Sequence, residues 1–221
     1  MLRGVFVTGT DTGVGKTAVS AALILRYAAS QRVRYWKPVQ TGIEQDDDTA
    51  RVQKLAGCRD AQVLAKGVRL PRPVSPDLAA RLSAQPIDMS KLLDTIRAES
   101  PENRWVVEGA GGVLVPLTAD QTLVDLMVRL SLPVVVVARS TLGTINHTLL
   151  TLEAVRARDL SVAGVVMVGP PDSENRAAIE QYGRVDVLGE MPLLSSLDTA
   201  SLRAWASAHL DKAGRLSEYF E

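Results

Sequence analysis

A glycine-rich segment near the start of the chain carries the residues best suited to chemistry. Residues 9–17 read Gly-Thr-Asp-Thr-Gly-Val-Gly-Lys-Thr, and an apolar run at residues 5–7 comes directly before them. A Gly-rich loop between a strand and a helix points backbone N–H groups at an anion. In such a loop Lys16 would reach β- and γ-phosphate oxygens, and the Thr17 hydroxyl would ligate Mg²⁺. The segment therefore predicts that the protein binds a nucleoside triphosphate.

The spacing of this loop differs from the usual phosphate loop. The common pattern separates its first glycine from Gly-Lys-Ser/Thr by four residues. That position is Thr10 here, and Gly9 lies one residue too early. Gly13 adds permissive backbone inside the loop, which suits a tight turn around a ligand. A Gly-rich turn that binds nothing is the alternative, but the preceding strand and following helix favour phosphate binding.

Two further charged residues follow apolar runs. Lys37 would serve as a second cation for phosphate or as a substrate contact; the alternative is a solvated lysine at a strand end. Glu108 follows the run at residues 105–107, where phosphate-loop proteins hold a carboxylate associated with Mg²⁺. The small residues at 109–112 would let the backbone approach a ligand, or they form an ordinary Gly-rich turn.

Two polar segments have both a structural and a functional interpretation. The acidic triplet at residues 46–48 precedes a helical run, so its charges either stabilise the helix N-terminus or include one Mg²⁺ ligand. Residues 140–148 are rich in hydroxyl and amide groups, which would cap the following helix or leave N–H groups for an anion. We expect His147 to have a capping or packing role rather than a catalytic one.

The composition predicts one soluble globular domain, residues 1–221, with a sizeable core. The chain is 46% hydrophobic and 23% charged. Its 25 basic and 25 acidic residues give a net charge of +0 without a basic tract, so we expect no nucleic-acid or membrane partner. The single cysteine, Cys58, allows no disulfide within the chain and is expected to pack rather than react. The sequence shows no secretion signal or apolar stretch of about 18 residues, so we expect a cytoplasmic protein.

Apolar runs alternate with helix-like segments along the chain. The four valines within residues 133–138 are apolar toward both faces, which is typical of a central parallel strand covered by helices. This alternation predicts an α/β fold, a doubly wound and mostly parallel sheet with helices on both faces. Its ligand should lie at the carboxyl ends of the strands. The expected strands are 4–8, 33–39, 104–108, 133–138, 162–168 and 185–188; the expected helices are about 16–30, 49–56, 88–99, 149–156 and 201–210, with 71–76 as a loop.

With these segments assembled, the chain resembles the dethiobiotin synthetase family of ATP-dependent ligases in biotin biosynthesis. The resemblance extends from about residue 7 to residue 194, and its phosphate loop is the family's own variant. It implies a P-loop NTPase-like fold and the conversion of 7,8-diaminononanoate, CO₂ or bicarbonate, and ATP to dethiobiotin, ADP and phosphate. The implied path runs through a carbamate and a carbamic-phosphoric anhydride. The segments that carry the resemblance are residues 8–17, 37–42, 107–112, 142–147 and 188–192.

The resemblance also implies a role for each matching residue. Lys16 and Lys37 would be catalytic, and Lys37 would neutralise the carbamate and the transferring phosphoryl group. Metal ligation would come from Thr17, Asp48 and Glu108. The diamine and its carboxylate tail would contact Thr12, Thr41, Leu142, Gly143 and Asn146, the last three from the neighbouring subunit of a homodimer. Nucleotide contacts would come from Gly13, Val14, Gly15, Lys16, Thr17, Ala18, Asp48, Glu108, Gly109, Ala110, Gly111, Gly169, Pro170 and Pro192.

One position departs from the family pattern, and it bears on the nucleotide. Many members carry an asparagine after the fifth strand that reads the adenine edge, whereas this chain has Gly169. Glycine has no side-chain amide, so the preferred cofactor stays open between Mg²⁺-ATP and other nucleoside triphosphates. Asn175 lies nearby but is displaced in sequence, and we do not assign it this role.

Two other protein classes share the sheet and the phosphate loop. Partitioning-type ATPases usually carry an extra lysine early in the loop, and residues 9–14 contain none. A cobyrinic-acid-type amidotransferase would need a glutaminase segment, which this sequence lacks. A nucleotide-binding protein without this chemistry is the remaining alternative.

Overall fold

A parallel sheet forms the centre of the molecule. Within residues 2–28 and 32–221, which the computed structural model describes, seven strands pair in the order β4-β2-β6-β1-β7-β8-β9. Every neighbouring pair runs parallel, which confirms the predicted fold class. The strands are β1 (Arg3–Gly9), β2 (Val33–Trp36), β4 (Val63–Leu64), β6 (Arg104–Gly112), β7 (Val134–Arg139), β8 (Val162–Val168) and β9 (Val187–Met191).

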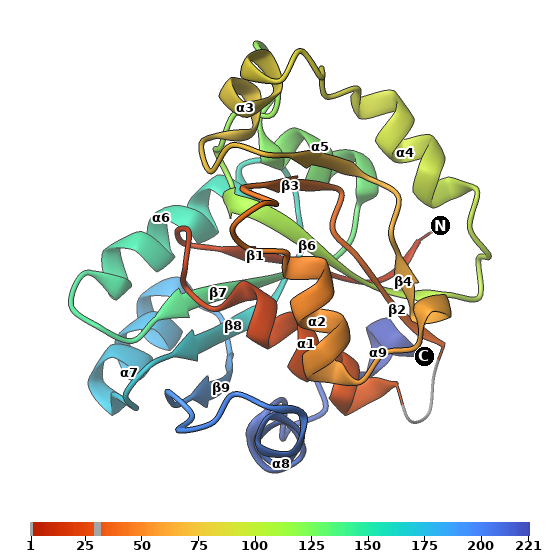
Figure 1. Cartoon of the computed structure of the whole chain (residues 1–221). Helices are drawn as coiled ribbons and strands as arrows, with labels where there is room; N and C mark the ends of the chain where they lie inside the picture. The colour runs from red at the N-terminus through yellow and green to blue at the C-terminus, as the bar shows by residue number, and fades with distance from the viewer. Residues whose placement is uncertain (1, 29–31) are drawn as a thin grey trace.

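Helices cover both faces of this sheet (Figure 1). Side chains alternate across a strand, so Val5 and Val7 of β1 face one core cluster while Phe6 faces the other. The helices on the Val5 side are α1 (Lys16–Tyr27), α2 (Asp48–Ala56), α8 (Thr199–His209) and the short α9 (Ser217–Phe220). Those on the Phe6 side are α3 (Pro76–Leu82), α4 (Met89–Arg97), α5 (Leu123–Leu130), α6 (Thr144–Arg156) and α7 (Ser173–Gly183).

The predicted strand at residues 33–39 is wrong in one respect, because it is two strands in two sheets. β2 ends at Trp36, and β3 (Val39–Thr41) pairs instead with β5 (Val68–Leu70), which follows the 3-10 turn η1 (Asp60–Gln62). Pro38 explains the break: it has no N–H to donate to the main sheet and restricts the residue before it. Its carbonyl accepts a hydrogen bond from Val68 N at 2.8 Å. Lys37 therefore lies where the chain leaves the central sheet.

Several predicted boundaries also shift. The helix expected at 149–156 already begins at Thr144, after Gly143 in a left-handed conformation with φ 91°. The strand expected at 185–188 begins at Val187 and continues to Met191. Strand β6 continues past Glu108 to Gly112, so Glu108 is not at a strand end. Residues 29 and 30 of the first expected helix lie outside the described residues.

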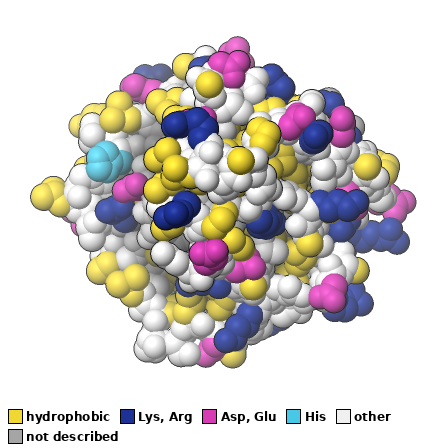
Figure 2. Space-filling view, turned by 45° about the horizontal axis from the view of Figure 1, so that its top comes forward, with side chains coloured by type: hydrophobic (Ala, Val, Ile, Leu, Met, Phe, Trp, Pro, Cys, Tyr) yellow, Lys and Arg dark blue, Asp and Glu magenta, His cyan; other side chains and the backbone are white. Residues whose placement is uncertain are grey.

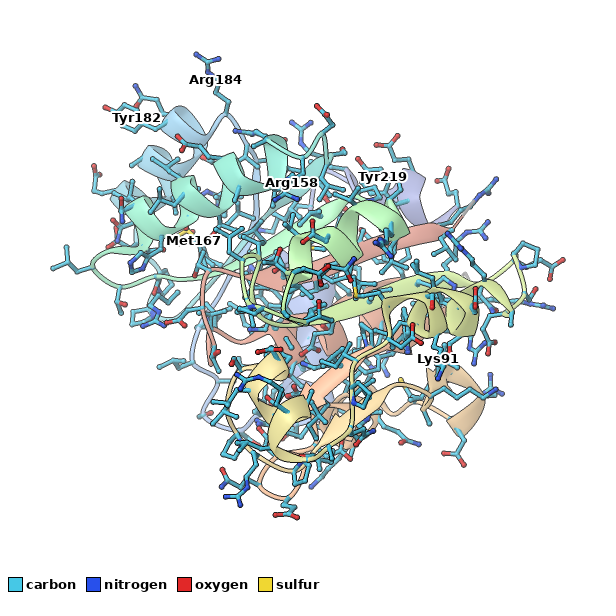
Figure 3. All side chains as sticks on the ribbon, turned by 90° about the horizontal axis from the view of Figure 1, so that it is seen from above. Lys91, Arg158, Met167, Tyr182, Arg184 and Tyr219 are labelled. Atoms are coloured by element: carbon cyan, nitrogen blue, oxygen red, sulfur yellow. The ribbon has the colours of Figure 1, made fainter. Side chains whose placement is uncertain are left out.

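The described residues form a large buried hydrophobic core, as the composition predicts. Val134, Val135, Val136, Val137 and Ala138 of β7 are all fully buried, which confirms a central strand. Met167 of β8 is fully buried and lies beside α6 in Figure 3, whereas Tyr182 and Arg184 at the end of α7 extend outward. Figure 2 shows acidic and basic side chains interspersed over one face. Among the described residues, no helix combines the length and the apolar character needed to cross a membrane.

We predict that Gly4→Ala strongly destabilises the fold. Gly4 has a φ of 120°, and an added Cβ would lie 2.7 Å from the carbonyl carbon of Trp105 on the neighbouring strand β6. Neither backbone can move without breaking the central sheet, so we expect a loss of about 3 kcal/mol or more in unfolding free energy. Urea denaturation measures this loss.

Gly57→Ala is the matched control for this prediction. Gly57 ends α2 with a φ of 64°, and an added Cβ would meet nothing within 4 Å. Its cost should be about 1 kcal/mol, from backbone strain alone. Equal losses in the two variants would contradict the steric argument for Gly4.

Candidate functional site

The glycine-rich loop connects β1 to the N-terminus of α1. Val14 is 2% exposed and anchors the loop in the core, while Gly13 and Gly15 on either side adopt φ of 73° and 100°. Gly15 caps α1, and its carbonyl accepts the first helical bond from Val19 N at 3.0 Å. The N–H groups in the first turn of a helix have no intrahelical acceptor. The loop is thus shaped as the sequence predicts for an anion cradle.

Four polar side chains meet beside this loop, and we call them the charge cluster: Thr17, Lys37, Asp48 and Glu108. The Lys37 ammonium donates to Asp48 Oδ2 at 2.5 Å, to Glu108 Oε1 at 2.8 Å and to the Gly109 carbonyl at 3.2 Å. The Thr17 hydroxyl donates to Asp48 Oδ1 at 2.7 Å, and Thr17 Oγ1 also lies 3.2 Å from Glu108 Oε1. Four elements, α1, β6, α2 and the break after β2, bring these groups together.

Burial makes the charges in this cluster interact strongly. Lys37 is 3% exposed and Glu108 is 0% exposed. Burial alone would lower the pKa of Lys37, but the carboxylates of Glu108 and Asp48 raise it above its ordinary value. Burial alone would raise the pKa of Asp48, but Lys37 and the Thr17 hydroxyl hold it below its ordinary value. Lys37 is therefore an ammonium and Asp48 a carboxylate at neutral pH.

The three acids of the triplet at residues 46–48 have different partners. Asp47 caps α2 by accepting from Ala50 N at 3.1 Å, and Asp46 forms a half-exposed ion pair with Arg51 at 2.8 Å. Only Asp48, the first residue of α2, turns into the charge cluster. The cap residue sets which acid faces the site, because successive helical residues point in directions about 100° apart.

Lys16 lies beside the cluster in a different environment. Its ammonium donates to the Asp11 carbonyl at 2.8 Å and is 7% exposed. Burial, followed by repulsion from Lys37, lowers the pKa of Lys16 to about 8. The Asp11 carboxylate forms an ion pair with Arg139 at 2.7 Å, which ties the loop to the end of β7. A bound polyphosphate would give this ammonium the negative partner it lacks.

The sequence analysis missed three residues that hold the site. Tyr35 Oη donates to Glu108 Oε2 at 3.0 Å, Arg69 Nη1 donates to the Lys37 carbonyl at 2.9 Å, and Arg139 pairs with Asp11. For Tyr35 a signal existed, since it lies two residues before Lys37 and alternate strand residues share a face. Arg69 and Arg139 carried no such signal, because their partners are distant in sequence.

The donor set fits Mg²⁺ and a polyphosphate. Mg²⁺ prefers oxygen ligands and usually takes one or two carboxylates together with phosphate oxygens. Thr17, Asp48 and Glu108 supply one hydroxyl and two carboxylates, and both carboxylates lie within hydrogen-bond distance of the hydroxyl. Among the described residues, no group of three or more His, Cys, Asp and Glu forms a metal cage on its own. A site of this composition needs phosphate oxygens to complete the coordination of the metal.

Other predicted residues surround this centre or lie apart from it. Thr12 Oγ1 lies near Gly111, Ala18 is in α1, and Thr41 ends β3. Leu142, Gly143 and Asn146 lie at the start of α6, where Leu142 is fully exposed. Within the described part of the chain, Leu142, Gly143 and Asn146 form no hydrogen bond or ion pair with the charge cluster. The remaining predicted residues, Gly109, Ala110 and Gly111, continue β6 beyond Glu108, and the Gly109 carbonyl accepts from Lys37.

The segment after β8 is closely packed. Gly169 has a φ of 134°, and a side chain at this position would collide with Ser140 Oγ. Ser140 is buried, and its hydroxyl has no hydrogen-bond partner among the described residues. Asn175 Nδ2 donates to the Ser140 carbonyl at 3.0 Å. The amide of Asn175 therefore points toward the segment around Gly169, but its donor is already used in this hydrogen bond. Pro170 is exposed, and Pro192 follows β9 at the rim of a cavity that also includes Glu190.

Comparisons with known proteins agree with one another. A family model described as an AAA domain matches residues 3–201. The ATP-dependent dethiobiotin synthetase BioD of Paramagnetospirillum magneticum is 49% identical over 91% of this chain and 93% of its own length. The biotin biosynthesis bifunctional protein BioCD of Bordetella avium is 48% identical over 92% of this chain. The chain spans only 42% of the length of that bifunctional relative.

Two solved structures share the fold at low sequence identity. A ParA family ATPase from Chlorobium tepidum TLS aligns with a TM-score of 0.58 at 12% identity, covering 93% of this chain and 99% of that chain. The septum site-determining protein MinD from Pyrococcus horikoshii, complexed with Mg-ADP, aligns with a TM-score of 0.57 at 16% identity, covering 93% and 95%. At this identity the likeness concerns the fold alone.

We predict that Lys16→Met is more stable than the wild type at pH 7 and that this difference shrinks as pH rises. The pKa of Lys16 is about 8 in the folded protein against 10.5 for a free lysine. Between these values the unfolded chain binds more protons than the folded chain, so rising pH stabilises the wild type. From pH 7 to pH 9.5 the wild type should gain about 2 kcal/mol relative to the variant. Denaturation of the ligand-free proteins at both pH values measures this gain.

Lys54→Met is the control for the loss of a lysine. Lys54 is exposed on α2 and lies outside the charge cluster. The difference in unfolding free energy between Lys54→Met and the wild type should stay constant from pH 7 to pH 9.5. If the difference in unfolding free energy between Lys16→Met and the wild type were also constant, this would contradict the conclusion that burial lowers the pKa of Lys16.

Proposed function

The chain belongs to the ATP-dependent dethiobiotin synthetase family of ligases, and from this premise we propose the reaction that its site performs. The protein carboxylates 7,8-diaminononanoate with CO₂ and closes the product to the cyclic urea of dethiobiotin, converting ATP to ADP and phosphate. The position of Lys37 carries this proposal: a buried ammonium, bracketed by two carboxylates, next to the threonine of a phosphate loop. We further propose that residues 1–221 act as one domain.

The proposed reaction has three steps. One amine of the diamine attacks CO₂ and loses a proton, which gives a carbamate. A carbamate oxygen then attacks the γ-phosphorus of ATP in line with the departing ADP, which forms a carbamic-phosphoric anhydride. The second amine attacks the carbamoyl carbon and loses a proton as phosphate leaves, which closes the ring. Such phosphoryl transfer depends mainly on positioning and on neutralising charge.

The charge cluster supplies this neutralisation. On substrate binding, Lys37 Nζ would exchange its contacts with Asp48 and the Gly109 carbonyl for hydrogen bonds to the carbamate and to oxygens of the transferring phosphoryl group, while Glu108 continues to hold it. Lys16 would leave the Asp11 carbonyl for the β- and γ-phosphates, and the backbone of residues 13–18 would cradle the triphosphate. Thr17, Asp48 and Glu108 would hold Mg²⁺, which when bound neutralises phosphate charge. Thr12, Thr41 and the backbone of residues 109–111 would position the diamine.

The tail of the substrate calls for a second copy of the chain. Leu142 at the start of α6 is fully exposed and Leu150 on α6 is 56% exposed, so both offer apolar area that a second copy of the chain would cover. In a homodimer, the N-terminus of α6 at Gly143 and Asn146 would offer N–H and amide groups to the carboxylate tail of the partner's substrate. We also propose a cytoplasmic location, because the substrates of this reaction are small and soluble.

Phosphate release with Mg-ATP and bicarbonate, with and without 7,8-diaminononanoate, tests the proposed function. We expect release to depend on the diamine, and dethiobiotin to form in equal amount by mass spectrometry. CTP and GTP should support turnover within about tenfold of ATP, because no amide at position 169 reads the base. Release that ignores the diamine would instead favour a switch ATPase with the same fold.

We predict that Lys37→Met lowers kcat at least about 10³-fold, since it removes the donor to the transferring group. The variant also leaves Glu108 buried without a counter-charge, so it should lose about 3 kcal/mol or more of stability. The double variant Lys37→Met/Glu108→Gln removes both charges and should recover much of that stability. Steady-state kinetics and urea denaturation measure the two effects. Near-normal turnover by either variant would contradict the role of Lys37.

A further inference from the structure

The two oxygens of Glu108 have different partners. Oε1 accepts from Lys37 Nζ at 2.8 Å and lies 3.2 Å from Thr17 Oγ1. Oε2 accepts from Tyr35 Oη at 3.0 Å. Tyr35 and Glu108 are both 0% exposed. The carboxylate is therefore held from two sides, by charged and polar groups of the site at one oxygen and by a neutral phenol at the other.

Strand register places Tyr35 against this carboxylate. Tyr35 of β2 pairs with Val106 of β6, and Trp36 pairs with Val107. Alternate residues of a strand share a face, so Glu108 lies on the same face as Val106 and one step further toward the carboxyl ends. The phenol of Tyr35 spans this step. The side chain also packs in the core cluster between the sheet and α1, which fixes its ring.

The phenol restricts how the carboxylate can rotate. A carboxylate turns readily about its terminal torsion, which is broad and roughly two-fold. Without a donor at Oε2, the buried oxygen would be left unpaired, and that is costly. The carboxylate would then turn Oε2 toward the Lys37 ammonium, the charged donor beside it. Such a turn would draw Oε1 away from Thr17, with which it would share the metal.

We propose that Tyr35 is a positioning residue that keeps Glu108 Oε1 directed at the metal position beside Thr17. Because the phenol is neutral, it does so without adding charge to the cluster and leaves Lys37 for the reacting groups. This inference rests on the proposed role of Glu108 in holding Mg²⁺. Residues that orient metal ligands commonly affect metal affinity about 10- to 100-fold when they are replaced.

Tyr35→Phe tests the proposal with the smallest change, since only the hydroxyl is lost. We expect the Mg²⁺ concentration that half-saturates turnover to rise about tenfold, with kcat at saturating Mg²⁺ close to the wild type. Calorimetry with β,γ-imido-ATP gives a readout that needs no turnover. In EDTA, the Tyr35→Phe variant should bind this nucleotide as tightly as the wild type does. Mg²⁺ should increase the nucleotide affinity of both proteins, but the variant should need about tenfold more Mg²⁺ for the same increase. Glu108→Gln should show a larger shift, and adding Tyr35→Phe to it should produce little further change.

Tyr27→Phe is the matched control. Tyr27 is also buried and donates to a buried carboxylate, Asp211 Oδ2, at 2.5 Å. This hydrogen bond connects the last residue of α1 to the C-terminal segment, outside the charge cluster. It loses the same hydroxyl and should leave the Mg²⁺ titration unchanged, whatever it does to stability. An unchanged titration in Tyr35→Phe, or an equal shift in Tyr27→Phe, would overturn the proposal. If nucleotide binding by the wild type ignores Mg²⁺, the proposed metal site fails instead, so the two failures are distinguishable.

Discussion

A buried balance of opposite charges is the constraint on which the site depends. Two ammonium groups, Lys16 and Lys37, face two carboxylates, Asp48 and Glu108, in a region almost closed to water. Removing Lys37 would leave the buried Glu108 carboxylate without a counter-charge, which costs several kcal/mol. The arrangement of the neighbouring elements follows from this requirement. Strand β6 must carry Glu108, and α2 must begin at Asp48, for Lys37 to be neutralised.

The break in the chain at Pro38 is what allows Lys37 to reach this position. A lysine inside a continuous strand would point to one face and be covered by a helix, whereas Lys37 lies between two sheets. The break is itself held from several sides: Trp36 Nε1 donates to the Lys66 carbonyl at 2.6 Å, and Arg69 Nη1 donates to the Lys37 carbonyl at 2.9 Å. The small sheet of β3 and β5 thus fixes the backbone on which the ammonium depends.

The sequence predicts well what is decided locally and poorly what is decided across the fold. The phosphate loop, the buried strand at Val134 and the helix with Trp205 follow from short-range patterns, and the structure has all three. Which acid of the triplet enters the site depends on a cap at Asp47, and that choice came only from resemblance to a family. The partnership of Tyr35 with Glu108 spans 73 residues and depends on register between two strands. The spacing of Tyr35 from Lys37 could mark it as a neighbour of the site, but no local pattern encodes its register with Glu108.

The ligand-free site keeps charges in an arrangement that a substrate would relieve. Lys16 has a backbone carbonyl as its partner and repulsion from Lys37 nearby, and both its burial and this repulsion lower its pKa. A triphosphate carries the negative charge that would give Lys16 a charged partner. The protein thus forgoes some stability in the free state, as functional sites commonly do when they violate rules that the rest of the fold obeys. In the proposed reaction, binding energy recovered in this way would be available where charge moves during phosphoryl transfer, rather than only in holding the ground state.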